Sequence, residues 1–284
     1  DKRMFKEFLS FSGWNVFGQI ALVGANQGVS MILNIFVGVV INAAVGIANQ
    51  VNTAVYSFVN NFQIAFNPQI IQTFANGEMD EHKKLLLSAS KISFFLLTFL
   101  VVPIIAFPKF ILNLWLGNTL PQYVIPFTQF ILLNSLIEAL IGPFWMSASA
   151  IGKIKRYQII ISIFIFLNVP VAYILLFYGV SPEYVMVAKF IISILTMVYR
   201  LYYADVTLSF KNVELFNYLK NIIPVFMFLI IIYYASHYFT QNWKNFVGYT
   251  ILLELFSFFI IVLWGMNKYE QNFIYKLIYK RIKN

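Results

Sequence analysis

Residues 157–178 read YQIIISIFIFLNVPVAYILLFY and contain no charged side chain. A transmembrane helix needs about 20 consecutive and predominantly apolar residues, so this run is long enough to cross a bilayer. Further runs of this kind lie at residues 8–38, 41–74, 85–107, 123–151, 184–203, 222–239 and 246–266. The sequence therefore predicts an all-α fold, a polytopic transmembrane helix bundle with about eight spans.

The composition excludes several classes of protein. Of the 284 residues, 60% are hydrophobic and 11% are charged, and the mean hydropathy is +0.76. Soluble domains carry about 25% charged residues. The chain has no cysteine and only two histidines, His82 and His237, both of which we expect in loops. A cysteine-bound metal is excluded, and a histidine metal cluster or a Ser-His-Asp triad has almost nothing to be built from. We therefore expect no cofactor, no metal site, no catalytic residue and no enzyme.

The lysines and arginines predict the orientation of the chain in the membrane. With the loops assigned alternately to the two sides, only Lys109, Lys189 and Lys244 of the 20 basic residues fall on one side. Cytoplasmic loops carry the excess of lysine and arginine, so the other side, with both chain ends, is expected to be cytoplasmic. The net charge of +9 then indicates contacts with anionic membrane lipids and not with nucleic acid. Residues 210–221 are expected to form a short amphipathic helix on this face, and the basic tail from Asn267 is expected to lie on it too.

The first two spans differ from the others because asparagine and glutamine recur along them at helical spacing, which keeps these side chains on one face of each helix. We predict a cavity wall formed by Asn15, Gln19, Asn26, Asn34, Asn49, Asn52, Tyr56, Asn60, Gln63 and Asn67. The same stripes include Ser30 and Asn42, and they are widened by Gln27, Gln50, Asn61 and Gln69.

These side chains cannot face lipid, because each unsatisfied polar group in hydrocarbon costs several kcal/mol. They either form hydrogen bonds between helices or line a hydrated cavity. Carboxamides in such number exceed what helix packing requires, so we favour the cavity. Uncharged donors and acceptors suit sugar hydroxyls, or another neutral polar solute, better than an ion.

Charged residues within the spans are rare and therefore informative. Glu138 is a candidate for pairing with a cation or for protonation, and Lys189 either extends outward to the membrane surface or contacts an anion in a cavity. Arg200, near a cytoplasmic helix end, is expected to reach the membrane surface. We expect Glu254, in the last span, to be structural or to lie at the lipid interface.

One long polar and aliphatic signature resembles a known family. It comprises NQG at 26–28, ILN at 32–34, the stretch from Asn42 to QVN at 50–52, FNPQI at 66–70 and GPFWMSASAIGKIKRYQ from Gly142. Over roughly residues 5–205, the chain resembles the Wzx-like polysaccharide flippases, which export O-antigen and capsule repeat units. They belong to the multidrug/oligosaccharidyl-lipid/polysaccharide exporter superfamily.

The resemblance implies that residues 1–207 form the second six-helix lobe of a MATE-like transporter and that the first lobe is missing. Residues 208–284 would be an amphipathic linker, two additional transmembrane helices and a basic cytoplasmic tail. The implied partners are a lipid-linked oligosaccharide, the N-terminal lobe and other polysaccharide-assembly proteins, in a bacterial inner (plasma) membrane. The chain departs from the family near Val45, where we expect an arginine and find AAVGIANQ, so an arginine–pyrophosphate contact there is in doubt.

Two other functions stay open at the level of sequence. A cation-coupled multidrug or small-solute antiporter of the same superfamily would need a site centred on a carboxylate, for which Glu138 is the candidate. A membrane enzyme of polysaccharide assembly would need a sizeable outer loop or catalytic His, Arg or Asp residues facing inward, and the sequence offers neither.

Overall fold

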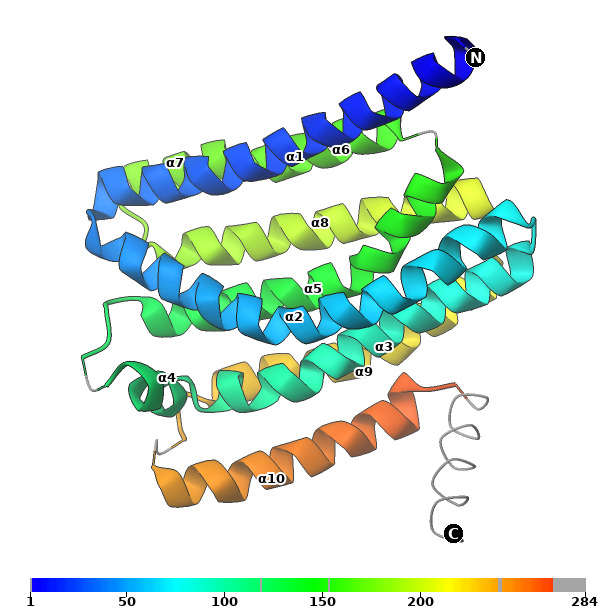
Figure 1. Cartoon of the computed structure of the whole chain (residues 1–284). Coiled ribbons are helices and arrows are strands. Elements are labelled where there is room, and N and C mark those ends of the chain that lie inside the picture. Colours follow the sequence, from blue (N-terminus) through cyan, green and yellow to red (C-terminus); the bar gives the residue numbers. More distant parts are fainter. Residues whose placement is uncertain (1, 118, 153, 240–241, 268–284) are drawn as a thin grey trace, which may run out of the picture. The chain divides into compact units, whose positions relative to one another are not determined.

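The computed structural model describes residues 2–117, 119–152, 154–239 and 242–267, and no strand occurs among them. The helices are α1 (Lys2–Val37), α2 (Val40–Ala75), α3 (Met79–Ala106), α4 (Pro108–Leu116), α5 (Val124–Ile151), α6 (Lys155–Phe166), α7 (Asn168–Phe177), α8 (Glu183–Leu208), α9 (Asn212–Ala235) and α10 (Trp243–Ile260), the last followed by a π-helical turn, η1 (Ile261–Gly265) (Figure 1). The predicted all-α membrane bundle is confirmed.

Seven segments of the described chain are long and apolar enough to cross a membrane, so this is a multi-pass membrane protein. They comprise α1 from Leu9, α3, α5, α6 with α7, α8, α9, and α10 with η1. The predicted span at residues 41–74 corresponds to α2, which is not among these seven segments. Helix α2 has the same 36-residue length as α1. The repeated asparagines and glutamines make α2 less apolar than the seven segments.

Several helix boundaries differ from the prediction. The run at 157–178 is interrupted at Leu167, between α6 and α7. Pro170 has no N–H to donate to the carbonyl of Phe166, so the α-helical ladder is broken at this point. The short helix α4 occupies part of the connection after α3, where no helix was predicted.

The amphipathic helix predicted at 210–221 is not a separate element, because α9 runs without a break from Asn212 to Ala235. The helix begins where the backbone N–H of Lys211 donates to Oε2 of Glu214 at 2.9 Å, which caps its first turn. The predicted basic tail from Asn267 lies almost wholly outside the described residues.

The chain divides into two compact units, which are described separately. The first contains Asp1–Leu97 and Leu112–Ser209, and the second contains Thr98–Ile111 and Phe210–Asn284. The second unit therefore includes the end of α3 and the segment after it, which the sequence prediction had placed with residues 1–207. In this unit the buried ring of Phe107 lies 5.4 Å from Phe239 and 5.6 Å from Phe246, so aromatic contacts join α3 to the region around α10.

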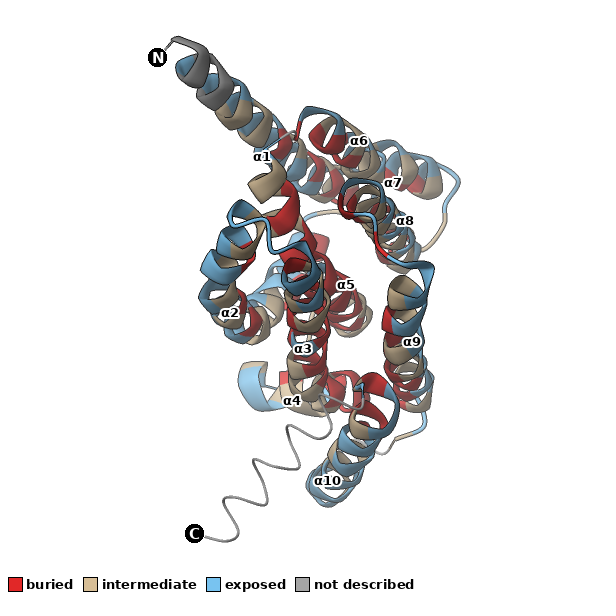
Figure 2. Ribbon diagram, turned by 90° about the vertical axis from the view of Figure 1, so that its right-hand side faces the viewer, coloured by how far each residue is buried: buried red, intermediate tan, exposed pale blue. Residues whose placement is uncertain are grey.

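Helix α5 is the centre of the first unit. It packs against α2 and α8, while α1 packs against α6 and α7, which in turn contact α8 (Figure 1). Most residues of α5 are buried, as Figure 2 shows, which is expected for a helix that is hydrophobic around its whole circumference. Helices α1 and α2 meet at a turn where Gly38 adopts a φ of +97°, a conformation that favours glycine.

A glycine permits the close contact between α1 and α6. A Cβ atom added at Gly18 would overlap the side-chain amide of Gln158, which is buried on α6. In contrast, a Cβ atom at Gly24 on the same helix would meet nothing within 4 Å. Gly28 contacts Val169 of α7, so the two glycines of the GxxxG pair do not share one helix contact.

We predict that Gly18→Ala lowers the free energy of unfolding by about 1–3 kcal/mol, because the added methyl group overfills the contact with Gln158. Gly24→Ala is the matched control and is expected to raise stability by about 0.5–1 kcal/mol, the usual gain from replacing glycine within a helix. Unfolding of the purified protein in detergent measures both changes. Equal stability of the two variants would show that the close approach of α1 and α6 does not depend on Gly18.

Candidate functional site

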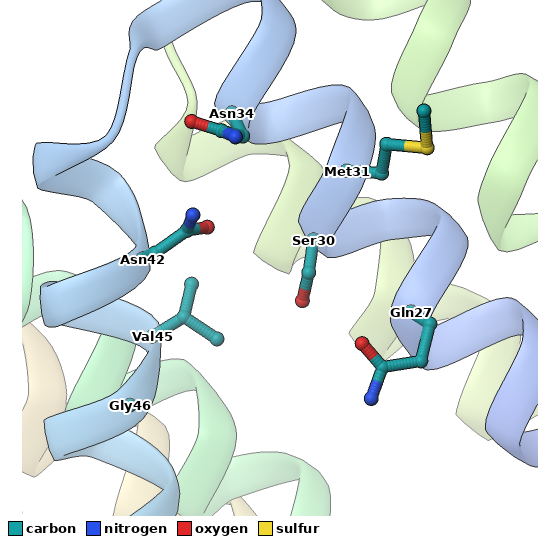
Figure 3. A pocket seen from close by; sticks show the side chains of 7 residues that line it. All are labelled: Gln27, Ser30, Met31, Asn34, Asn42, Val45 and Gly46. Carbon is teal, nitrogen blue, oxygen red and sulfur yellow. The ribbon is translucent and has the colours of Figure 1, made fainter.

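A polar pocket of about 430 Å³ lies between α1 and α2, close to the turn that joins them. Its lining residues are Gln27, Ser30, Met31 and Asn34 from α1 and Asn42, Val45 and Gly46 from α2 (Figure 3). Figure 3 shows the side chains of Ser30 and Asn42 directed into the space between the two helices. The lining contains carboxamides and a hydroxyl but no charged side chain.

The spacing of these residues explains why they share one pocket. Gln27, Ser30 and Asn34 are separated by three and four positions, so they lie on one face of α1. Asn42 and Gly46 are four positions apart on α2 and lie on the face opposite. A Cβ atom at Gly46 would meet nothing within 4 Å, so the glycine leaves space in the pocket.

The ten residues predicted for the cavity wall occupy different environments. Asn34 lines the pocket, together with Gln27, Ser30 and Asn42 from the wider stripes. The exposed members are Gln19, Asn26, Asn49 and Asn60, the half-buried ones are Asn15, Asn52, Tyr56 and Asn67, and Gln63 is buried. The stripes therefore extend well beyond the pocket.

Gln63 forms an interhelical hydrogen bond, which is the alternative role considered for these carboxamides. Its Nε2–H donates to the carbonyl of Ala139 at 2.9 Å and joins α2 to α5. The side-chain oxygens of Asn52 and Asn67 are also buried, but they accept no hydrogen bond from the described residues. Buried acceptors of this kind are rare in proteins, so these two oxygens can accept a hydrogen bond from water or a ligand.

The two predicted intramembrane charges both have neutral hydrogen-bond partners in the first unit. Nζ of Lys189 on α8 donates to Oδ1 of Asn26 on α1 at 3.1 Å. Nδ2 of Asn134 donates to Oε1 of Glu138, one turn further along α5, at 3.0 Å, and the glutamate itself is exposed. Asn26, predicted for the cavity wall, therefore holds the cation of a neighbouring helix.

Arg200, which was predicted to reach the membrane surface, contacts Tyr157 near the start of α6. It donates from Nη1 to the hydroxyl of Tyr157 at 2.9 Å, and its guanidinium carbon lies 5.4 Å from the centre of the tyrosine ring. Its Nε is buried and has no partner among the described residues. The side chain packs on α6 because the aromatic face attracts the cation. Sequence spacing alone does not reveal this contact, since Tyr157 and Arg200 belong to different helices.

His82 was predicted in a loop, and this prediction is wrong. The residue lies in the first turn of α3 and is fully buried. Its Nδ1 is 3.0 Å from the carbonyl oxygen of Ile70, which can only accept, so Nδ1 carries the proton. In the neutral ring, Nε2 then accepts from the hydroxyl of Ser147 on α5 at 2.8 Å. The ring joins α2, α3 and α5.

The described residues contain no group of three or more His, Cys, Asp or Glu side chains that could hold a metal ion. Comparison of the chain with protein-family profiles, curated proteins and solved structures finds no match.

We predict that His82→Leu lowers the free energy of unfolding by about 1–3 kcal/mol, because it leaves the hydroxyl of Ser147 and the carbonyl of Ile70 buried with fewer partners. His237→Leu provides a matched control, since His237 is the other histidine of the chain and is exposed. The His237→Leu substitution should change the free energy of unfolding by no more than about 0.5 kcal/mol. Thermal unfolding in detergent compares the two variants, and equal midpoints would exclude a structural role for the buried ring.

Proposed function

We propose that this chain is part of a transporter that moves undecaprenyl-pyrophosphate-linked oligosaccharide from the cytoplasmic to the outer leaflet of a bacterial plasma membrane. The observation that carries the proposal is the uncharged polar pocket between α1 and α2, in a protein that is otherwise a membrane helix bundle. Carboxamides and hydroxyls donate and accept hydrogen bonds without selecting for charge, which is what sugar hydroxyls require.

The size and position of the pocket support this proposal. Its volume of about 430 Å³ lies in the range of about 300–1,000 Å³ that is common for small-molecule sites. The pocket opens between two long helices, so a sugar headgroup can be sheltered there while its lipid tail stays in the bilayer. Water-filled or protein-lined cavities are the places where polar residues are tolerated at membrane depth.

Several helices of the first unit have the features of elements that bend. Pro68 lies inside α2, Pro143 lies inside α5, and the helical ladder is broken between α6 and α7. Proline kinks are local and allow one part of a helix to move relative to the other. In the proposed mechanism, the lobe formed by the first unit rocks against a second lobe and exposes the pocket to each side of the membrane in turn.

A cation-coupled antiporter of small solutes is the second candidate, and one observation favours it. Glu138 is an exposed carboxylate on the central helix α5, and such a group can bind a proton or a metal cation during transport. This function predicts cation-dependent efflux of dyes and drugs. The oligosaccharide function predicts loss of surface polymer instead.

We predict that the double variant Asn34→Leu/Asn42→Leu lowers export of the oligosaccharide at least about fivefold, since each lost hydrogen bond contributes about 1 kcal/mol to binding. Gln72→Leu is the matched control, because Gln72 is an exposed carboxamide of α2 outside the pocket. Surface polysaccharide of the complemented host measures export. Full export by the double variant would exclude this pocket as the sugar site.

The wider polar stripes make a separate prediction. Asn26→Leu, Asn49→Leu and Asn60→Leu each remove an exposed carboxamide from α1 or α2 and should abolish export if the stripes line the path of the headgroup. Each variant is measured by polymer yield at equal protein level in the membrane. Unaltered yield in all three would overturn the assignment of these residues to the cavity.

Deletion of the gene in its host separates the two candidate functions. Accumulation of lipid-linked repeat units in the cytoplasmic leaflet, with loss of surface polysaccharide, supports the flippase. Normal polymer with altered drug sensitivity supports the antiporter.

A further inference from the structure

Glu254, in the second unit, is an intramembrane carboxylate that the proposed function does not use. It is the middle residue of the 23-residue apolar segment Trp243–Gly265, which α10 and η1 form together. At about 1.5 Å per residue, it lies about 16 Å from either end of this segment. The hydrocarbon core of a bilayer is about 30 Å thick, so the carboxyl group lies near its centre. A glutamate side chain is too short to reach water from that depth.

Glu254 lies on the side of α10 that packs against the protein. Thr250, Glu254 and Ser257 are separated by four and three positions, so they share one face of the helix. Thr250 and Glu254 are half-buried and Ser257 is fully buried, whereas Leu252 and Leu255 are exposed. The three polar side chains therefore form a short stripe on the packed side of α10.

The hydrogen bonds of this stripe are incomplete. The hydroxyl of Ser257 lies 2.9 Å from the backbone carbonyl oxygen of Glu254 and 3.3 Å from its Oε2, and it can donate to either. Oγ1 of Thr250 is buried and has no hydrogen-bond partner among the described residues. An ionised carboxylate only accepts hydrogen bonds, whereas a neutral carboxylic acid also has one O–H to donate. Side chains four positions apart on a helix are neighbours, so this O–H can donate to Thr250.

No basic residue of the described chain lies near Glu254 to neutralise it. The nearest one on α10 is Lys244, ten positions and about 15 Å earlier along the helix. The carboxyl group is subject to burial and to the hydrogen bond from Ser257, and no charged side chain of the described residues acts on it.

The elements packed against α10 also bring no charge to the level of Glu254. Helix α9 contacts α10 through the rings of Phe228 and Phe256, and the end of α3 contacts it through Phe99 and Phe258. Neither η1 nor residues 98–106 of α3 contain a titratable side chain. The titratable residues of α9 lie toward its two ends, and α10 adds one more; they are Glu214, Tyr218, Lys220, Tyr233, Tyr234 and, on α10, Tyr249.

We propose that Glu254 is a reversible proton-binding site of the second unit, held as a neutral carboxylic acid that accepts from Ser257 and donates to Thr250. An isolated carboxylate in hydrocarbon is far more costly than the neutral acid, so without a counter-cation the group takes up a proton. The proton also supplies the donor that Thr250 lacks. The site goes beyond the proposed function, because the sugar pocket belongs to the first unit and neither site requires the other.

Release of the proton depends on a movement of α10. Ionisation leaves an unpaired charge at the centre of the membrane, so it occurs only when water reaches the carboxylate. The π-helical turn η1 begins four positions after Ser257. Turns of this kind are rare, occur often at functional sites and are points at which helices bend. A bend at η1 shifts the face that carries Glu254 and admits water to it.

The test measures the reaction of Glu254 with dicyclohexylcarbodiimide, an apolar reagent that dissolves in the bilayer and adds to neutral carboxylic acids. The carboxyl oxygen bonds to the central carbon of the reagent, the carboxyl proton moves to one of its nitrogens, and no atom leaves. The adduct then rearranges to a stable N-acylurea.

The protein encoded by the full gene is labelled in lipid nanodiscs over a series of pH values, and peptide mass spectrometry locates the adduct. Glu254 should be labelled at low pH. Above the midpoint of the titration, labelling should fall about tenfold for each pH unit, because the neutral fraction falls by that factor.

Glu81 and Glu254→Gln provide the controls. Glu81 is an exposed carboxylate in the first turn of α3 and should stay unlabelled, because the reagent remains in the bilayer. Glu254→Gln should lose the adduct. Infrared difference spectra between low and high pH give an independent measurement on the same samples. One neutral-carboxyl band that disappears as the pH rises should be missing from Glu254→Gln and retained by Glu254→Asp.

The two hydroxyl residues form a matched pair of variants. Thr250→Val removes the acceptor of the neutral acid and should move the midpoint of labelling to lower pH. Ser257→Ala removes the donor to the ionised form and should move the midpoint to higher pH. Each shift should be about 0.5–1 pH unit, the effect of one hydrogen bond. Two shifts in the same direction would contradict the assigned hydrogen bonds.

Three results would overturn the proposal. They are the absence of an adduct at Glu254 at every pH, labelling that does not change with pH, and an unchanged infrared spectrum in Glu254→Gln. Protection of Glu254 by Na⁺ at constant pH would also overturn it, since the carboxylate would then bind an alkali cation in place of a proton.

The outcome is separable from that of the proposed function. Asn34→Leu/Asn42→Leu alters the sugar pocket and should leave the labelling of Glu254 unchanged. A pH-dependent adduct together with normal surface polymer after gene deletion would refute the oligosaccharide function and retain the proton site. Loss of export in the pocket variant without an adduct at Glu254 would retain the oligosaccharide function and refute the proton site.

Discussion

The hydrocarbon core of a membrane offers no hydrogen-bond partner, and the structure of this protein depends on that constraint. The backbone satisfies it by forming helices throughout the described spans. Side chains satisfy it by bonding to the central helix α5. Gln63 donates to the carbonyl of Ala139, Ser90 donates to that of Leu140, and His82 pairs with Ser147. These bonds connect α2 and α3 to α5, and the apolar contacts of α5 fill the space between them.

Because of the same constraint, polar groups that helix packing does not satisfy are informative about function. The pocket between α1 and α2 is lined by the carboxamides of Gln27, Asn34 and Asn42. Lys189 and Arg200 are held by the neutral side chains of Asn26 and Tyr157. A neutral polar pocket and two cations with neutral partners thus occur in one unit.

The division of carboxamides between two roles was not visible in the sequence. Gln63 and Asn60 are three positions apart and follow the same helical pattern, yet Gln63 is buried against α5 while Asn60 is exposed. Period and residue type place a side chain on a helix face, but the neighbouring helix decides whether that face is covered. For the same reason the sequence placed His82 wrongly in a loop and did not reveal the contact of Arg200 with Tyr157, since the partners Ser147 and Tyr157 lie on other helices.

The sequence by itself determined the all-α class, the membrane location and the approximate limits of the spans, because these follow from the length and hydropathy of continuous runs. It also located the polar stripes and the rare charges. Only the tertiary structure decided that Asn34 and Asn42 share a pocket, that Gln63 is buried against α5, and that Lys189 and Arg200 meet partners on α1 and α6. Each of these depends on how separate helices pack against one another, which local pattern does not encode.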